Sequence, residues 1–239
     1  MSTEALRVLA FDTSAHVTSL AICHGQVVIE QHEVSDGKHA ETLLPNVKAM
    51  LAQAGWTLAQ IDVIGVGVGP GSFTGVRVGV ATAKGLGLAL QKPVIPVISL
   101  DALAHEALRV TDSLRIAACL DAFKGELFCA VYTRKGNELQ RERAPFHATP
   151  DLVHESLAAV SGDDLLALVG AGITRYPELL ADAPGAWQIY NGIAAPRASV
   201  VAELALARFA AGEAPELAKV APVYLRDSDA QLPKVPLRV

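Results

Sequence analysis

The feature that most constrains the fold is a glycine-rich turn between a buried-strand pattern, Ile61 to Gly67, and a long apolar helix pattern, Phe73 to Leu90. The glycines in and before this turn alternate with other residues, at Gly65, Gly67, Gly69 and Gly71. Glycine lets the backbone turn sharply, and the helix that follows directs free N–H groups at the turn. A further strand pattern follows at Pro93 to Ser99. A strand, a turn, a helix and a strand in this order are typical of an α/β sheet.

A second pattern indicates two related halves. The run Leu6 to Asp12 is echoed by Leu114 to Asp121, and each run is followed by two strand candidates joined by tight turns. Strands joined in this way form an antiparallel meander, and each meander is followed by α/β material. We therefore predict a duplicated α/β architecture with one lobe at 1–108, a second at 109–226 and a loose tail at 227–239. Whether the last helix packs back on the first lobe is left open.

Composition sets the broad class of protein. The chain has 239 residues, of which 51% are hydrophobic and 19% charged, so it can bury a large core. It contains no run of about 20 uninterrupted apolar residues, and its start does not resemble a secretory signal. The three cysteines lack CxxC spacing, as is expected of free thiols in a reducing compartment. We expect a cytoplasmic protein without a membrane partner.

The charge pattern bears on nucleic-acid binding. The net charge is −5, and lysine and arginine do not cluster anywhere along the chain. A protein that holds nucleic acid by itself needs a cationic surface that displaces counterions from phosphates. If this chain acts on RNA, we expect another subunit to hold the RNA.

The glycine turn has two interpretations. As a phosphate site it would use a set of residues at the turn and at the end of the first strand: Asp12, Gly69, Pro70, Gly71, Ser72, Thr74 and Gly75. The turn lacks the lysine of a P-loop, and Pro70 interrupts any dinucleotide fingerprint. The alternative is a tight strand-to-helix connection that Ser72 or Thr74 caps, and we favour it over tight nucleotide binding. Asp12 and its counterpart Asp121 fit either a metal-bridged phosphate or a local turn.

The helix after the turn gives a sharper signal. Small residues recur every fourth position, at Gly75, Gly79, Ala83 and Gly87, and apolar residues occupy most other positions. A helix on one side of a sheet has a polar outer face, whereas this one is expected to be covered on two sides. The second cover is either the apolar helix pattern at 39–54 or a second molecule. Candidate partner contacts on the two helices are Leu44, Val47, Met50, Leu51, Gly75, Val76, Gly79, Val80, Ala83 and Gly87.

The remaining polar pairs do not assemble a recognisable catalytic or metal site. His39 and Glu41 are two positions apart, so they do not face each other on a helix. His105 and Glu106 begin an HExxH-like pattern, but Arg109 stands where the second histidine belongs. We therefore predict no catalytic residue, no metal site and no cofactor.

Four motifs resemble one family. They are HAETLLP (His39 to Pro45), VGPGSFTGVRVGVATAKGL (Val68 to Leu86), PVISLDAL (Pro96 to Leu103) and PVYLR (Pro222 to Arg226). Together they closely resemble the bacterial TsaB (YeaZ) family, although Phe123 stands where that family usually has arginine. The resemblance implies the actin/Hsp70-like ATPase (ASKHA) fold, with two related lobes that each contain a mixed sheet and flanking helices.

The resemblance also implies a role. The family belongs to the machinery for the threonylcarbamoyl modification of adenosine 37 in tRNAs that read ANN codons, and its catalytic member is the paralogue TsaD. The metal-binding histidines of TsaD fall at Ser99 and Leu103 of this chain, and neither side chain replaces an imidazole ligand. Family members form homodimers, and heterodimers with TsaD, through the two N-terminal helices, and the ATPase TsaE joins the complex.

The sequence thus predicts a non-catalytic scaffold that activates TsaD and meets tRNA indirectly. Two alternatives remain at this point. One is a small kinase of the same fold that uses Asp12 and the Gly69–Thr74 turn; the other, which is disfavoured, is a metallopeptidase.

Overall fold

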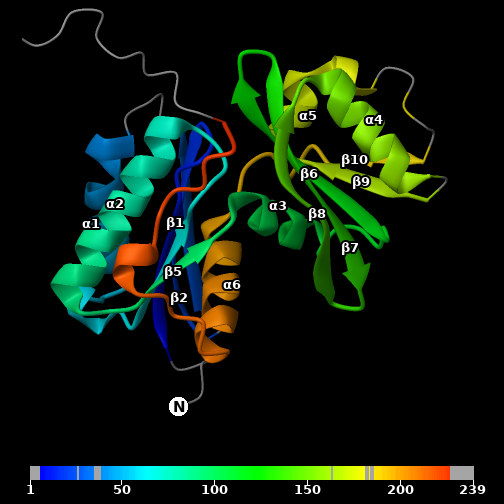
Figure 1. The fold of residues 1–239 in the computed structure, drawn as a ribbon. Helices are drawn as coiled ribbons and strands as arrows, with labels where there is room; N and C mark the ends of the chain where they lie inside the picture. The colour runs from blue at the N-terminus through cyan, green and yellow to red at the C-terminus, as the bar shows by residue number, and fades with distance from the viewer. Residues whose placement is uncertain are drawn as a thin grey trace, which may run out of the picture.

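The computed structural model of the chain describes residues 6–25, 27–34, 39–162, 164–180, 183 and 186–226. Within these residues the strands form two five-stranded sheets (Figure 1). The first sheet has the order β3-β2-β1-β4-β5 and consists of β1 (Arg7–Asp12), β2 (Val17–His24), β3 (Val27–Val34), β4 (Val63–Gly67) and β5 (Val94–Val97). The second has the order β10-β9-β6-β7-β8 and consists of β6 (Arg115–Phe123), β7 (Glu126–Lys135), β8 (Glu138–Ala148), β9 (Leu166–Val169) and β10 (Trp187–Ile189).

The two sheets have the same topology. In the first, β1 is antiparallel to β2, β2 is antiparallel to β3, and β1, β4 and β5 run parallel. In the second, β6, β7 and β8 form the antiparallel meander, and β6, β9 and β10 run parallel. This correspondence confirms the predicted fold class of two related lobes, each built on a mixed sheet.

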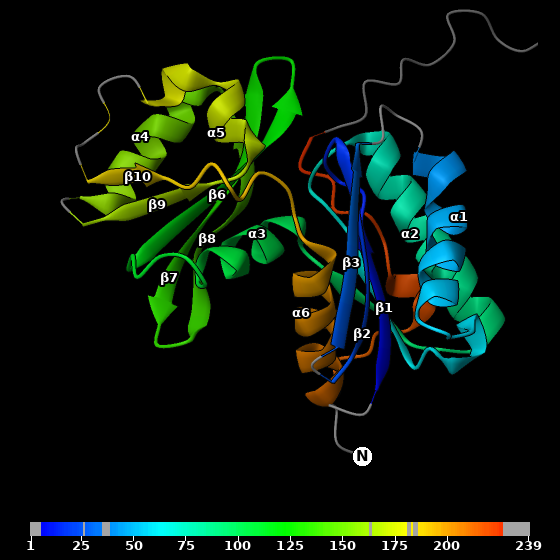
Figure 2. The same cartoon turned by 180° about the vertical axis from the view of Figure 1, so that it is seen from behind.

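Helices cover both faces of the first sheet. One face packs against α1 (His39–Gln53) and α2 (Phe73–Leu90), and the other against α6 (Ala198–Ala210) (Figures 1 and 2). Strand residues alternate between the faces, so Leu9 and Phe11 of β1 face α1 and α2, and their neighbours face α6.

The second sheet is covered in the same manner. Helix α3 (Ser99–Ala107) packs on one face, and α4 (Pro150–Ser161) and α5 (Ala171–Arg175) pack on the other. Short 3₁₀ turns complete the described elements, at Leu58–Gln60, Pro177–Leu180 and Leu217–Lys219.

The boundary between the lobes was predicted at residue 108, but the chain passes from one lobe to the other both before and after that residue. Helix α3 precedes that residue and packs on the second sheet, whereas α6 follows it and packs on the first. A cut at residue 108 would therefore separate each helix from the sheet it covers.

A buried carboxylate joins the lobes. Asp101 of α3 accepts hydrogen bonds from Tyr132 Oη at 2.8 Å and from Arg141 Nη2 at 2.6 Å, both on the second sheet. Arg208 of α6 contacts the same carboxylate at 3.3 Å. Hydrogen-bonded pairing compensates the cost of burying a charge. This network therefore couples α6, which packs on the first sheet, to the second sheet.

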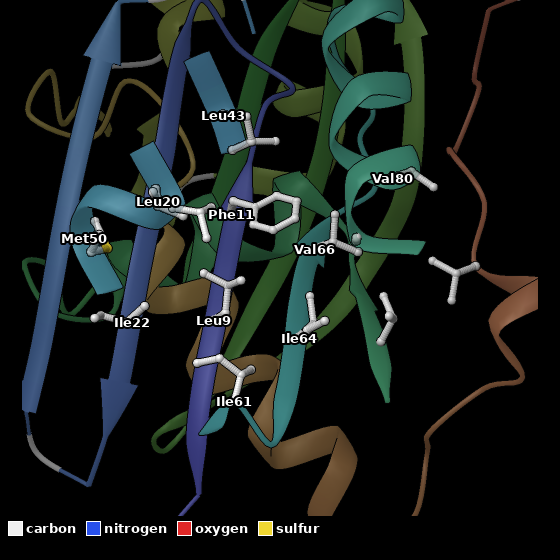
Figure 3. Packing of buried hydrophobic residues seen from close by; sticks show 14 of the residues in the cluster. Leu9, Phe11, Leu20, Ile22, Leu43, Met50, Ile61, Ile64, Val66 and Val80 are labelled. Carbon is white, nitrogen blue, oxygen red and sulfur yellow. The ribbon is translucent and has the colours of Figure 1, made fainter. Parts of the chain in front are cut away.

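The largest apolar cluster lies between the first sheet and the two N-terminal helices (Figure 3). Most of its side chains come from β1, β2, β4, α1 and α2. Those labelled in Figure 3 are Leu9, Phe11, Leu20, Ile22, Leu43, Met50, Ile61, Ile64, Val66 and Val80. Burying each large apolar side chain contributes about 1.5–3 kcal/mol, so this face of the sheet fixes how α1 and α2 lie.

Candidate docking surface and the glycine turn

The glycine turn is packed tightly against the loop between β1 and β2. A Cβ atom added at Gly67 would lie within 3.0 Å of the Asp12 carboxylate, and one at Gly71 within 3.0 Å of the Ser14 backbone. Gly69 has a φ of +88°, a conformation that L side chains rarely adopt. Gly67 and Gly71 require glycine because the chain itself fills the space of a side chain, and Gly69 requires it because of its positive φ.

The hydrogen bonds of the turn are likewise made within the chain. The Gly69 N–H donates to Ser99 Oγ at 3.1 Å, and the Ser72 N–H donates to the Ser14 carbonyl at 2.7 Å. Ser72 caps α2 by accepting from the Gly75 N–H at 3.3 Å, which is the capping role that the sequence suggested. The Gly69 and Ser72 amides are therefore already bonded within the chain.

Asp12 is enclosed rather than open to a ligand. Its Oδ1 accepts from the Ser14 N–H at 2.8 Å and from Ser14 Oγ at 2.5 Å, and its Oδ2 accepts from Ser99 Oγ at 2.6 Å. Burial raises the pKa of this carboxyl above its ordinary value, although the Ser14 and Ser99 hydrogen bonds oppose the shift. Asp121 is also engaged locally, since it accepts from the Phe123 N–H at 2.7 Å and from Tyr176 Oη at 2.8 Å.

Ser99 and Leu103 are both buried, and both side chains contact other parts of this chain. Ser99 Oγ bridges Asp12 and the Gly69 amide, and Leu103 belongs to the core of the second lobe. Among the described residues, no three His, Cys, Asp or Glu side chains lie together in a group that could hold a metal ion.

The small-residue stripe of α2 faces inward. Nine of the ten candidate partner contacts are buried within the chain: Val47, Met50, Leu51, Gly75, Val76, Gly79, Val80, Ala83 and Gly87. Gly75 and Gly79 lie against Thr13, and Gly87 lies against Val94 and the Lys92 carbonyl. In this structure the nine residues contact the chain itself, and their assignment to a partner stays a prediction. Their small size lets α2 approach its own sheet closely, and Leu44 alone of the ten is exposed, at 43%.

The opposite side of the same two helices carries exposed apolar residues. Leu88 is 73% exposed, and it follows Ala81 and Gly85 on α2 at helical spacing. We call this surface the outer helical face, and it consists of Leu44, Pro45, Ala49 and Ala52 of α1 with Val78, Ala81, Gly85, Leu88 and Ala89 of α2. Exposed apolar residues on two packed helices are typical of a protein interaction site.

The structure contains one further segment whose contacts the sequence patterns did not predict. Residues 213–226, which we call the strap, cross α2 on their way to the second lobe (orange to red in Figure 1). Lys84 Nζ donates to the Val220 carbonyl at 3.0 Å, and the Val223 N–H donates to the Val68 carbonyl at 2.8 Å. Arg226 then reaches the Ala122 carbonyl at 2.7 Å. The PVYLR motif marked this segment in the sequence. The spacing of its residues does not indicate which part of the chain the segment contacts.

The comparisons with known proteins agree with this geometry. A family model described as TsaD, tRNA N6-adenosine threonylcarbamoyltransferase, matches residues 24–154. The tRNA threonylcarbamoyladenosine biosynthesis protein TsaB of Escherichia coli is 33% identical over 224 residues, which are 93% of this chain and 96% of that protein. The chain belongs to the TsaB (YeaZ) family. The Haemophilus influenzae protein of the same name is 28% identical over 93% of this TsaB-family chain and 94% of its own length.

Solved structures support the same assignment. YeaZ from Pseudomonas aeruginosa has a TM-score of 0.81 at 33% identity, covering 92% of this chain and all of that one. Another Pseudomonas aeruginosa structure, described as an uncharacterized protein with similarity to peptidase YEAZ, has a TM-score of 0.80 at 34% identity, with the same coverage. In the part of the chain that the structure describes, no helix is both long and apolar enough to cross a membrane.

Proposed function

We propose that this TsaB-family chain is a non-catalytic subunit that binds a TsaD-type transferase and activates it for N6-threonylcarbamoylation of adenosine 37 in tRNAs reading ANN codons. Family membership supports the pathway, since the named relatives are tRNA threonylcarbamoyladenosine biosynthesis proteins. TsaE is proposed to join the complex, and tRNA to be held by the other subunits. The net charge of −5 fits that division of labour.

The outer helical face is the observation that carries the proposal. Its apolar residues lie on two helices whose inner sides are fixed by the core, so the surface is rigid before binding. A preorganised apolar surface loses little conformational entropy on association, which favours stable docking. We propose that the same face also supports a homodimer, which would compete with TsaD-type binding.

The enclosed glycine turn supports the non-catalytic part of the proposal. Asp12 is saturated by Ser14 and Ser99, and the Gly69 and Ser72 amides are bonded within the chain. A kinase of this fold would need that carboxylate and those amides free for a nucleotide.

Reconstitution tests the proposal. TsaD, TsaE, the enzyme that makes the threonylcarbamoyl adenylate, and tRNA are combined with and without this chain, and the modified base is measured by mass spectrometry of tRNA digests. We expect product only with the chain present, and no product from the chain without TsaD. Equal product in its absence would refute the activator role.

A further inference from the structure

Arg77 is a cation at the edge of the outer helical face, and contacts within the chain hold its side chain in place. Arg77 of α2 places its guanidinium 3.7 Å from the centre of the Phe73 ring and 5.6 Å from that of Tyr224 on the strap. Arg77 Nε donates to Tyr224 Oη at 2.8 Å, and the two rings lie 5.2 Å apart. Two aromatic contacts and a hydrogen bond therefore fix the position of the guanidinium.

The charge of Arg77 is not paired with a carboxylate among the residues that the structure describes. Within the described part of the chain, no Asp or Glu forms an ion pair with Arg77, and its two Nη groups make no hydrogen bond. Arg77 is exposed, so these N–H groups face solvent. A guanidinium with a fixed orientation and free Nη groups suits bidentate recognition of an oxyanion, and little side-chain entropy is lost when it binds.

The charges on the two helices indicate the nature of the partner. Helices α1 and α2 carry three cations, Lys48, Arg77 and Lys84, against one carboxylate, Glu41. The two helices thus carry more cations than carboxylates in a chain whose net charge is −5. A second copy would bring two positive faces together, whereas a surface bearing carboxylates would complement this one.

The surroundings of Arg77 favour a protein over RNA. Val78 and Ala81 adjoin Arg77 on the helix, and Leu88 extends the apolar surface further along it. RNA backbones are held by clustered cations, whereas an arginine at the rim of an apolar surface is typical of protein–protein hot spots.

We propose that Arg77, held by Phe73 and Tyr224, is the specificity contact of the outer helical face, and that it binds a carboxylate side chain of a different protein subunit in preference to a second copy of this chain. The inference rests on the proposed function, because it assumes that the outer helical face is the docking surface. It adds the residue that distinguishes the partner from self.

The test measures the affinity of the purified chain for the TsaD-type subunit of the same organism by calorimetry. Arg77→Gln is expected to weaken binding about 30-fold, the factor that corresponds to about 2 kcal/mol, and to reduce its salt dependence. Arg77→Lys keeps the charge without the planar fork, so it should recover only part of the affinity. The matched control is Arg175→Gln, because Arg175 is also exposed and lies near an aromatic ring, 5.9 Å from the centre of Tyr176, but on the second lobe.

Two further measurements separate the possible failures. Ala81→Arg places a bulky charge on the outer helical face; if it leaves affinity unchanged, the proposed docking surface is wrong. If Ala81→Arg abolishes binding while Arg77→Gln matches Arg175→Gln, the docking surface stands and the role of Arg77 is refuted. Sedimentation of the chain alone should show unchanged or stronger self-association in Arg77→Gln. Equal weakening of self-association, or a selective loss of tRNA binding, would assign Arg77 to a second copy or to RNA and overturn the inference.

Discussion

Two glycines on α2 allow a direct test of which side of this helix faces the chain. A Cβ added at Gly79 would lie within 3.0 Å of Thr13 Oγ1, which itself donates to the Gly75 carbonyl at 2.7 Å. A Cβ at Gly85 would meet nothing within 4 Å. The substitutions Gly79→Ala and Gly85→Ala therefore add the same methyl group to one helix in opposite environments.

The expected free energies follow from this contrast. Alanine favours a helix over glycine by about 1 kcal/mol, so Gly85→Ala should stabilise the protein by about that amount. Gly79→Ala gains the same term but loses about 1 kcal/mol from the displaced Thr13 hydrogen bond and about 1–3 kcal/mol from overpacking. We expect the two variants to differ in unfolding free energy by about 2–4 kcal/mol.

Urea unfolding followed by tryptophan fluorescence measures this difference, and calorimetry on the folded proteins measures association with the TsaD-type subunit. Gly79→Ala should lower stability without a selective loss of affinity. If both variants have the same stability, or if Gly79→Ala folds normally but fails to associate, the small-residue stripe faces a partner and our assignment of the inner side is refuted.

Three further predictions concern buried polar groups. Ser99→Ala removes the hydroxyl that bridges the Asp12 carboxylate and a backbone amide, and thermal unfolding should show a loss of about 2–3 kcal/mol, whereas an unchanged melting temperature would mean that the bridge is absent. Burial, together with the nearby His16 side chain, lowers the pKa of His39, so folding favours its neutral form. The stability present above about pH 6.5 should be lost as the pH falls through the lowered pKa, by up to about 1.4 kcal/mol per pH unit. Denaturation at pH 7.5 and 5.5 should show a smaller loss in His39→Gln than in the wild type, and equal losses would contradict this cause. Asp101→Asn should lower the free energy of unfolding by about 3–5 kcal/mol, because it removes the buried carboxylate that two arginines share. A near-neutral effect in chemical denaturation would count against the described junction of the lobes.

The sequence predicted the fold better than it predicted the site. Period-2 and helical patterns depend on local burial, and the echo of Leu6 to Asp12 in Leu114 to Asp121 correctly indicated two related sheets. The small and apolar residues of α2 indicated that a neighbour covers a second side of this helix. They did not identify that neighbour, because a stripe of small residues fits the chain's own sheet as well as it fits a second molecule.

The features that the sequence did not predict depend on contacts between residues far apart in the chain. The hydrogen bond between Ser99 and Asp12 spans 87 positions, and the contact between Arg77 and Tyr224 spans 147. No periodicity within either segment encodes these pairs, since the tertiary fold alone brings them together. The enclosed turn and the fixed guanidinium therefore became visible only in the structure.

The most direct test of the account is a titration of modified tRNA formation against the concentration of this chain, in the reconstituted system, for the wild type and for Ala81→Arg. The account predicts no product without the chain, and a half-saturating concentration that rises at least tenfold in Ala81→Arg with the same final yield per complex. Product formed without the chain, or identical curves for the two proteins, would contradict the claim that the outer helical face docks and activates the transferase.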